Sequence, residues 1–291
     1  MDPVRTSSSS SDVVLALACP DRGGIVHAVS GFVWERAGLI RESQQYADPT
    51  SGRFFMRVNA SLHQPLPLDE LREEFSLIGD RFNMSWTLTD SADRPRVAIL
   101  VSKLGHCLND LLYRVSTGQL RVEVALVVSN HADLGALVRS HGIPFIHVPI
   151  TPDSKPRAEA RLMELLDEYR ADFVVLARYM QVLSDAVCAQ LSGRIINIHH
   201  SFLPSFKGGR PYNQAHERGV KLVGATAHYV TADLDEGPII EQEVIRVDHH
   251  LEPADLVVAG RDAEMLALAR AVRWHAEQRI LLNGHRTVVF R

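Results

Sequence analysis

Two short segments of the chain carry the side chains that could do chemistry on a carbonyl group. Asn197 and His199 alternate in an apolar strand, IINIH, so both side chains point to the same side of that strand. The stretch that follows, residues 201–209, is rich in turn formers and ends the strand, and open α/β sheets bind ligands at this end. Further along, Asp235 lies in the segment LDEGPII, before another apolar run. An amide, an imidazole and a carboxylate that converge could stabilise an oxyanion and move a proton without a metal or a covalent intermediate.

The bulk composition is that of a globular protein with no preference for polyanions. The chain has 291 residues, 46% of them hydrophobic and 23% charged, which is enough for two domains. Its formal net charge of -4 gives no basic surface that would predict binding to nucleic acid. No apolar run reaches the roughly 18–20 residues of a membrane span, so we expect no membrane partner.

The cysteines indicate a reducing compartment. Cys19, Cys107 and Cys188 are odd in number and far apart, so they form neither a disulfide framework nor a paired metal motif. The polar start of the chain has no apolar segment typical of a signal peptide. We therefore expect a cytoplasmic protein in which residues 1–11 are a disordered lead-in.

The first part of the chain, residues 12–90, has the pattern of a small ferredoxin-like βαββαβ domain. The expected strands and helices, in chain order, are strand 13–19, helix 25–38 with Gly38 as its C-cap, strands 39–48 and 53–60, helix 68–82 and strand 83–90. A polar stretch with a proline, residues 91–95, is the expected linker.

The second part, residues 96–291, alternates strands and helices. Near-continuous apolar strands between amphipathic helices indicate an α/β, Rossmann-like domain with a mostly parallel sheet covered on both faces. After the strands 221–230 and 238–247, we expect a long outer helix at 253–282 and a closing strand at 285–290.

The residues at 195–209 and 234–240 resemble the signature of folate-dependent formyltransferases, most closely their deformylase branch. That branch transfers the formyl group of 10-formyltetrahydrofolate to water. Further segments support the resemblance, which covers nearly the whole chain: PDRGGIV (20–26), GRFFMR (52–57), VSKLGHCLNDLL (101–112), ARYMQVLS (177–184) and GATAHYVTADLDEGPIIEQ (224–242).

This resemblance implies an N-terminal ACT domain, a small-ligand sensor, and a C-terminal formyltransferase-type catalytic domain. By motif, Asn197, His199 and Asp235 match the catalytic residues of the family. Met180, Val182 and Leu183 match the segment that lines the pteridine pocket, and Gln181 stands where relatives that formylate glycinamide ribonucleotide usually have arginine.

One departure from those relatives favours water as the acceptor. They carry a Gly-Ser-Asn-type loop that holds the phosphate of the acceptor, whereas residues 102–110 here read SKLGHCLND, with one glycine and no run of backbone amides. A phosphorylated acceptor would lose its anchor, although Lys103 and His106 could still contact an anion. Methionyl-tRNA formyltransferases carry a further domain, for which the residues after the last core strand leave little room.

The expected function is therefore hydrolysis of 10-formyltetrahydrofolate to formate and tetrahydrofolate. It would supply formate to purine synthesis and balance the folate pool. Asn197 and a protonated His199 would stabilise the oxyanion, and Asp235 would hold the imidazole charged and orient or deprotonate the water. The alternatives are a formyltransferase to an amine acceptor and a non-catalytic sensor of folate or amino acids.

Several histidines have other interpretations. His199 and His200 with His228, or His249 with His250, could suggest zinc, but neighbours on a strand point to opposite faces, so we expect no metal and no cofactor. His200 is expected to support the pocket wall. His228 is either near the catalytic carboxylate or an ordinary core residue.

Two loops could bind small ligands. Lys207–Arg210 is either a phosphate site at a helix N-terminus or a tight turn, and we favour the turn. In the ACT-like domain, Asp21, Arg22, Gly23 and Gly24 either grip the carboxylate of an amino acid or form a plain turn in a dimerisation module. ACT units usually pair, so we expect a homo-oligomer. The resemblance suggests methionine and glycine as the first effectors to test.

Overall fold

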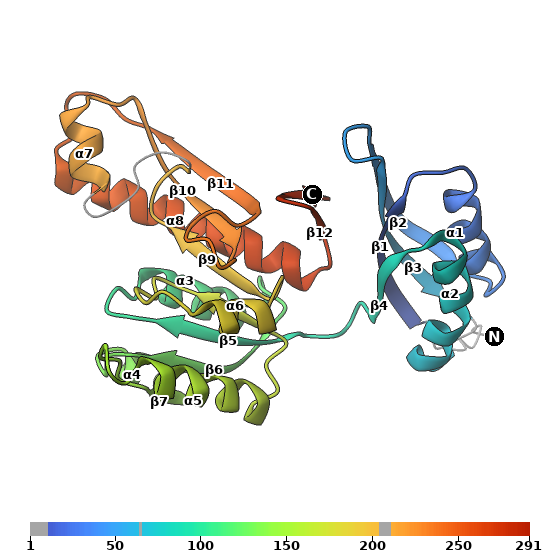
Figure 1. Ribbon diagram of the computed structural model, residues 1–291, viewed down its shortest axis with the longest axis horizontal. Helices are drawn as coiled ribbons and strands as arrows, with labels where there is room; N and C mark the ends of the chain where they lie inside the picture. The colour runs from blue at the N-terminus through green and yellow to red at the C-terminus, as the bar shows by residue number, and fades with distance from the viewer. Residues whose placement is uncertain (1–10, 64–65, 204–210) are drawn as a thin grey trace, which may run out of the picture. The chain divides into compact units, whose positions relative to one another are not determined.

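A computed structural model describes residues 11–63, 66–203 and 211–291 of the chain (Figure 1). The described residues fall into two compact units, which divide between Asp93 and Arg94. The expected lead-in at residues 1–11 lies almost wholly outside the described residues, and so does the turn or phosphate site expected at 207–210.

The first unit has the predicted βαββαβ order, which is confirmed. Its sheet is antiparallel, with strand order β2-β3-β1-β4, as in a ferredoxin-like fold. The elements are β1 (Ser11–Pro20), α1 (Ile25–Trp34), β2 (Leu39–Asp48), β3 (Arg53–Leu62), α2 (Leu68–Phe82) and β4 (Ser85–Asp90).

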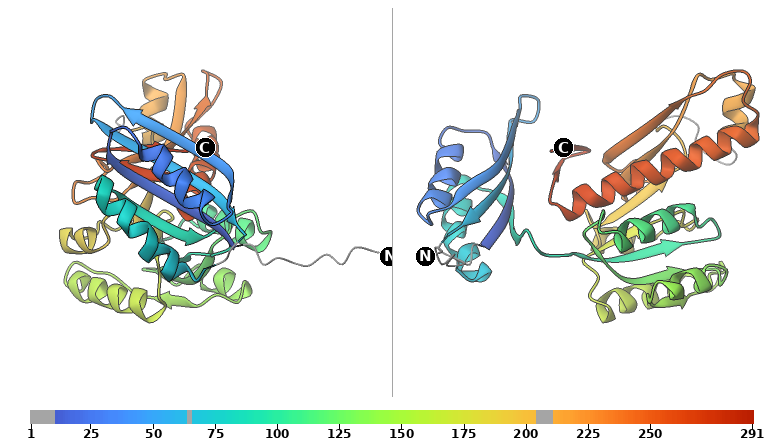
Figure 2. Two further views of the ribbon diagram at one scale, coloured as in Figure 1. Left: turned by 90° about the vertical axis from the view of Figure 1, so that its right-hand side faces the viewer. Right: turned by 180° about the vertical axis from the view of Figure 1, so that it is seen from behind.

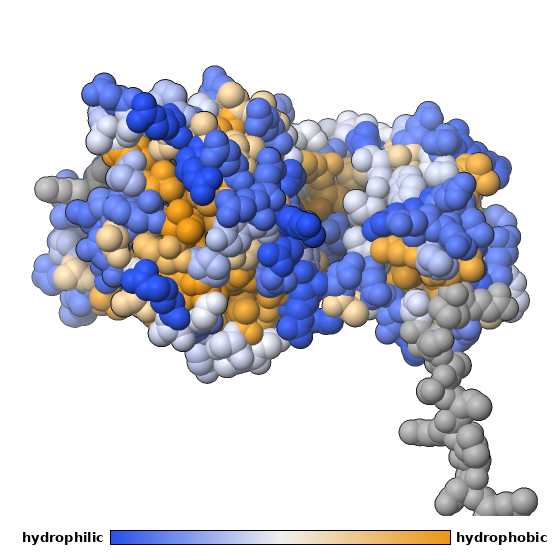
Figure 3. Space-filling view, turned by 90° about the horizontal axis from the view of Figure 1, so that it is seen from below, coloured by the Kyte–Doolittle hydropathy of each residue, from blue (hydrophilic) through white to orange (hydrophobic). Residues whose placement is uncertain are grey.

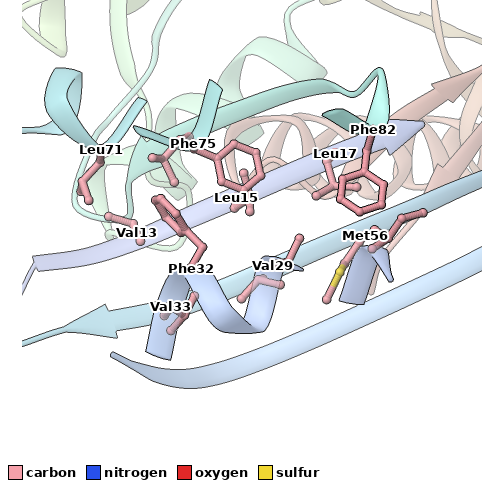
Figure 4. Close-up of a cluster of buried hydrophobic side chains, with 14 of the residues drawn as sticks. Val13, Leu15, Leu17, Val29, Phe32, Val33, Met56, Leu71, Phe75 and Phe82 are labelled. Carbon is pink, nitrogen blue, oxygen red and sulfur yellow. The ribbon is translucent and has the colours of Figure 1, made fainter. Parts of the chain in front are cut away.

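Both helices of this unit pack on one face of the sheet. Figure 4 shows Phe32 of α1 and Phe75 of α2 beside Val13 and Leu15 of β1, in one cluster of buried side chains. The two phenyl rings are 5.1 Å apart at 81°, the edge-to-face arrangement that aromatic pairs prefer. Alternate residues of β1 form this core, as expected for side chains that change sides along a strand.

The prediction that Gly38 caps the first helix is wrong. Helix α1 ends at Trp34, and Ala37 adopts the left-handed conformation, with φ of 50°. Position 38 favours glycine for another reason, because a Cβ atom there would lie 2.7 Å from Val33 Cγ1 and 2.8 Å from Leu62. The glycine therefore permits close packing behind the helix instead of ending it.

The C-terminal end of the chain differs from the prediction in two ways. Helix α8 (Pro253–Ala276) stops six residues before the predicted end at residue 282, and Gln278 beyond it has a φ of 55°. The chain then forms a two-stranded hairpin, β12 (Ile280–Asn283) and β13 (Arg286–Val289). Residues 277–283 and 288–291 belong to the first unit, so the predicted catalytic domain of 96–291 needs a correction at this end.

Charged and apolar contacts hold this C-terminal segment on the second face of the antiparallel sheet. Arg279 donates through Nη1 and Nη2 to the two carboxylate oxygens of Glu42, at 3.0 and 3.1 Å. Arg57, buried on the sheet, donates to Glu42 at 2.8 Å and to the carbonyl of Glu277 at 3.1 Å. The hydrogen bonds from Arg279 hold the pKa of Glu42 below its ordinary value. The first unit is thus completed by residues from the far end of the chain.

Replacing Leu281 with alanine is expected to destabilise the first unit by about 2–3 kcal/mol, because a buried leucine leaves a cavity. Leu281 is 9% exposed and packs with Ala16, Ala18 and Phe55. The neighbouring Leu282 is 45% exposed, so Leu282→Ala is the matched control and should change stability by less than about 0.5 kcal/mol. Urea unfolding of both variants measures the difference, and equal stabilities would contradict the packing of this segment.

The second unit contains a seven-stranded sheet with the order β11-β10-β9-β8-β5-β6-β7. The five strands from β9 to β7 are parallel, and β10 and β11 are antiparallel, so the predicted mostly parallel sheet is confirmed. Its elements before α8 are β5 (Arg96–Val101), α3 (His106–Ser116), β6 (Glu123–Ser129), α4 (Gly135–Ser140), β7 (Phe145–His147), α5 (Lys155–Glu168), β8 (Phe173–Leu176), α6 (Asp185–Gln190), β9 (Ile195–His199), α7 (Pro211–Glu217), β10 (Leu222–Tyr229) and β11 (Ile239–Arg246).

Helices cover both faces of this sheet. Apolar residues of α5 and α6 pack against β5, β6 and β8 on one face. On the other side, the 24-residue α8 runs along β9, β10 and β11, as the view from behind shows (Figure 2). Strand β9, which carries Asn197 and His199, is therefore held between layers. Its position is fixed by packing on both faces.

The surface combines apolar and polar residues. In Figure 3, hydrophobic residues of both units reach the surface between hydrophilic ones. Among the exposed large apolar side chains are Met180, Val182 and Leu234 of the second unit. No helix among the described residues combines the length and apolar composition that crossing a bilayer requires.

Candidate active site

A cavity of about 270 Å³ lies at the carboxyl ends of β8 and β9. This is the place where open α/β sheets bind ligands, because the loops that follow the strands leave a crevice there. All nine residues predicted for catalysis and substrate binding line it: Met180, Gln181, Val182, Leu183, Asn197, His199, His200, His228 and Asp235. Residues from four separate segments of the chain therefore meet at one site.

Strand β9 presents Asn197 and His199 to the same side of the sheet. The strand pairs in parallel with β8 and antiparallel with β10, so its backbone is fixed from both sides. His199 is the last residue of β9 and pairs with Thr226, while Asn197 pairs with His228. The register of β9 against β10 thus places Asn197 beside His228.

The loop between β10 and β11 brings Asp235 to these residues. Asp235 has a φ of 57°, a left-handed conformation that aspartate tolerates better than most residues. Gly237 follows where the chain passes close to β10, and a Cβ atom there would lie 1.7 Å from the carbonyl oxygen of Tyr229. The motif Asp-Glu-Gly-Pro therefore combines a strained carboxylate residue with an obligatory glycine, a pattern found at functional sites.

His199 and Asp235 form a buried pair. Nδ1 of His199 lies 3.2 Å from Oδ2 of Asp235, and the side chains are 8% and 19% exposed. The hydrogen bond from His199 holds the pKa of Asp235 below its ordinary value, although burial acts in the opposite direction. Nε2 of His199 is buried and has no hydrogen-bond partner among the described residues. One imidazole nitrogen is therefore held by a carboxylate and the other is left for a substrate oxygen.

His228 orients the amide of Asn197. Nδ1 of His228 is 2.9 Å from the carbonyl oxygen of Tyr229, which can only accept, so Nδ1 carries the proton. Burial lowers the pKa of His228, which favours the neutral ring with Nε2 as an acceptor. Nδ2 of Asn197 donates to this Nε2 at 3.1 Å. The second hydrogen of the same amide group is left for a ligand.

The two adjacent histidines do not point to opposite sides, so this part of the sequence prediction is wrong. The rings of His199 and His200 stack with centroids 4.9 Å apart and 26° between their planes. His200 lies beyond the end of β9, where the alternation of a strand no longer applies. The same holds for His249 and His250, which follow β11 and whose centroids are 3.9 Å apart. The expectation of no metal thus cannot rest on strand geometry.

The segment after β8 forms an apolar rim of the cavity. Met180 and Val182 are 59% and 55% exposed, and Leu183 is buried. Apolar side chains that remain exposed at the mouth of a cavity are suited to a flat aromatic ligand. The structure places Gln181 in the same wall.

Arg178 also lines the cavity and was not among the predicted site residues. Its φ is 63°, a strained value for a residue with a side chain. A charged residue two positions after the buried strand FVVL was the available signal. Its buried partner, Glu264 on α8, could not be found from local patterns.

Ser102, after β5, and His106, at the start of α3, form hydrogen bonds with other residues of the protein. The hydroxyl of Ser102 donates to Asn130 Oδ1 at 2.7 Å and accepts from the backbone of Met180 at 3.0 Å. Nε2 of His106 donates to Glu264 Oε2 at 2.8 Å. His106, which was left open as an anion contact, is therefore engaged by a carboxylate.

A second cavity, of about 430 Å³, lies in the first unit. Gly24 precedes α1 with a φ of 94°, which requires glycine. Arg22, Gly23 and Gly24 line the cavity together with residues of α1 and α2. Asp21 is not part of its lining, and its backbone amide donates to the carbonyl of Gly52 at 2.9 Å. Three of the four residues predicted for an effector site thus share one cavity.

The geometry of the second unit agrees with comparisons to known proteins. The formyl transferase family model matches residues 95–272. A curated formyltetrahydrofolate deformylase of Corynebacterium sp. (strain P-1) is 57% identical, over 96% of this chain and 98% of that protein.

Solved structures give the same result. A formyltetrahydrofolate deformylase of Burkholderia mallei is 51% identical with a TM-score of 0.93, covering 97% of this chain and 100% of the other. A glycinamide ribonucleotide transformylase of Symbiobacterium toebii is 34% identical with a TM-score of 0.63. The match covers 68% of this chain and 95% of the transformylase chain. The chain belongs to the formyl transferase family and, within it, to the formyltetrahydrofolate deformylases.

Proposed function

We propose that this protein hydrolyses 10-formyltetrahydrofolate to formate and tetrahydrofolate. The observation that carries the proposal is the convergence of Asn197, His199 and Asp235 on one cavity. Among the described residues, Nε2 of His199 has no hydrogen-bond partner, and the amide of Asn197 uses one hydrogen on His228. Proteins that are named formyltetrahydrofolate deformylases align with this chain over nearly their full length.

The site residues have distinct roles in this reaction. Attack of water on the formyl carbon converts the carbonyl oxygen into an oxyanion, which can accept from the second amide hydrogen of Asn197 and, in the imidazolium form of His199, from Nε2–H. Asp235 holds His199 through one carboxylate oxygen and can accept the proton of the water through the other. The bond between the formyl carbon and N10 then breaks, N10 takes up the proton that Asp235 accepted from the water, and the formic acid that leaves ionises to formate. The apolar segment at Met180 to Leu183 and the imidazoles of His200 and His228 form the walls against which the folate lies.

The same donors make a cofactor and a metal unnecessary in this scheme. An amide hydrogen and an imidazole polarise the carbonyl, which is the role of a Lewis acid in metal-dependent hydrolases. We accordingly propose that the folate is the substrate and that no cofactor takes part.

The test is incubation of the protein with 10-formyltetrahydrofolate in the presence of a chelator and without any amine. We expect multiple turnovers, with equal amounts of formate and tetrahydrofolate. Release that begins only on addition of an amine would replace hydrolysis with formyl transfer. Folate binding without release under either condition would indicate a sensor without activity.

We further propose that the first unit is an ACT domain that regulates the reaction. The cavity at Arg22, Gly23 and Gly24 offers backbone amides at the start of α1 and a guanidinium, a suitable combination for an amino-acid carboxylate. Methionine and glycine should change the rate of formate release in the intact protein, and Arg22→Ala should reduce this response. An unchanged response in that variant would place the effector elsewhere.

The remaining proposals concern the setting of the protein. We propose a homo-oligomer, which light scattering of the purified chain tests. We place the protein in the cytoplasm because its three cysteines are free and buried, as expected in a reducing compartment. We also propose that the released formate supplies purine synthesis and that the reaction balances the folate pool.

A further inference from the structure

A buried carboxylate joins three elements beside the cavity. Glu264 lies near the middle of α8 and is 2% exposed. Its carboxylate lies 2.8 Å from His106 Nε2, 3.4 Å from Arg178 Nε and 3.3 Å from the hydroxyl of Tyr212. Burial alone would raise the pKa of Glu264, but the hydrogen bond from His106 and the charge of Arg178 keep it below its ordinary value. This carboxylate is therefore a charged anchor inside the fold.

Arg178 is the member of this cluster that reaches the cavity. It lines the cavity wall, while its Nε is buried within 3.4 Å of the carboxylate of Glu264 and makes no regular hydrogen bond among the described residues. Its carbonyl oxygen accepts from the backbone of Ser102 at 3.2 Å, and Met180 is tied to the hydroxyl of the same serine. A left-handed conformation of a non-glycine residue costs about 1–2 kcal/mol and persists where the surroundings fix it.

His200 lines the same cavity as Arg178 and lies within range of its charge. It stacks on His199 inside the same cavity wall. The charged or titratable groups that face it are Arg178, His199, Glu264 and Asp235. Burial, and next to it the charge of Arg178, lower the pKa of His200 to about 4. His200 is therefore uncharged at neutral pH and does not compete with His199 for a proton.

We propose that Arg178, anchored by the buried carboxylate of Glu264, is a positioning residue of the active site that acts on the reaction through His200. This role rests on the proposed hydrolysis, because Arg178 would keep His200 uncharged during that reaction. Loss of the guanidinium allows His200 to take up a proton closer to neutral pH. A second positive charge then stacks on His199, where it opposes the imidazolium that stabilises the oxyanion.

The sign of the effect separates this role from a merely structural one. Removal of the positive charge in Arg178→Met raises the pKa of His200, so the acid limb of the kcat profile should move upward. The expected size is about one pH unit, typical of one charge several ångströms away at an effective dielectric constant of about 20. The negative charge of Glu264 raises the pKa of His200, so its removal in Glu264→Gln lowers that pKa. The acid limb of the Glu264→Gln variant should therefore not move upward. Both variants lose the ion pair between Arg178 and Glu264. If that pair had only a structural role, the two variants would change the kcat profile in the same way.

The experiment measures kcat and KM for formate release between pH 3.5 and 8, a range that includes the pKa of His200 of about 4 and its expected value in Arg178→Met. We expect Arg178→Met to show the upward shift, with a lower kcat on the acid limb and little change at neutral pH. Arg178→Lys should return the acid limb to the wild-type position because it restores the charge. Arg121→Met, at an exposed arginine outside the cavity, controls for the loss of a positive charge. Melting curves of each variant establish that it is folded.

A direct titration of the His200 imidazole by NMR in the folate-free protein gives a readout that needs no activity. His200→Asn identifies the signal. A rise of its pKa in Arg178→Met supports the proposal, and an unchanged pKa together with an unchanged profile overturns it. If the wild type releases no formate, the proposed function fails, whereas normal wild-type turnover with unshifted variants contradicts only the role of Arg178.

Discussion

Replacement of Asp235 with asparagine is expected to lower kcat for formate release by about 10²–10⁴, the usual contribution of general acid–base catalysis. The amide has nearly the size of the carboxylate, so the loop and the cavity should keep their shape. It carries no charge, so it can neither stabilise a protonated His199, 3.2 Å away, nor accept the proton of the attacking water. Single-turnover release of formate measures the chemical step without interference from product release.

Two controls belong to this experiment. Asp262→Asn removes an exposed carboxylate on α8 and should leave turnover within a few-fold of the wild type. Binding of a folate that lacks the formyl group, followed by quenching of protein fluorescence, should be nearly the same in Asp235→Asn and the wild type. If Asp235→Asn keeps more than about a tenth of the wild-type kcat, the carboxylate does not have the proposed role.

The pH dependence of the wild type follows from the same pair. The hydrogen bond with His199 holds the pKa of Asp235 below its ordinary value of 3.8. A group with a lowered pKa contributes stability above its unfolded-state pKa and loses it as the pH falls through the folded value. The carboxylate is therefore charged throughout pH 5–9, and an acid limb seen in that range belongs to another group.

The sequence was sufficient for the features that depend on local pattern. The βαββαβ order and the parallel strands follow from apolar periodicity and from turn formers such as those at residues 49–52. The position of Asn197 and His199 at a strand end follows from the run IINIH. These predictions succeeded because each rests on residues that are neighbours in the chain.

The features that were missed depend on contacts between distant residues. Glu264 lies in a helix whose pattern gives no sign of its partner Arg178, and only the packing of α8 on the sheet brings them together. The helix predicted to residue 282 ends early because residues such as Leu281 find an apolar surface on the antiparallel sheet of the first unit. His200 departs from strand alternation because the strand ends one residue earlier. Propensity and periodicity do not contain this information.

Replacement of Asn197 with alanine is expected to lower kcat by about 10²–10³, which is typical for the loss of one oxyanion donor. KM should change less than kcat, because the contact strengthens only when negative charge develops on the formyl oxygen. Rates at saturating and at limiting folate separate the two effects. A variant with unchanged kcat and raised KM would show that Asn197 binds the folate without stabilising the oxyanion.

His228 tests whether the direction of this amide matters. In His228→Leu the side chain keeps a similar volume but offers Asn197 no acceptor, so the amide loses its fixed orientation. Because one neutral hydrogen bond contributes about 1 kcal/mol, kcat should fall by roughly fivefold to tenfold. If His228 acts only through Asn197, the double variant should be no slower than Asn197→Ala alone. Losses that multiply in the double variant would instead mean that His228 contributes to the reaction independently, and the neutral imidazole between Tyr229 and Asn197 would need a separate role.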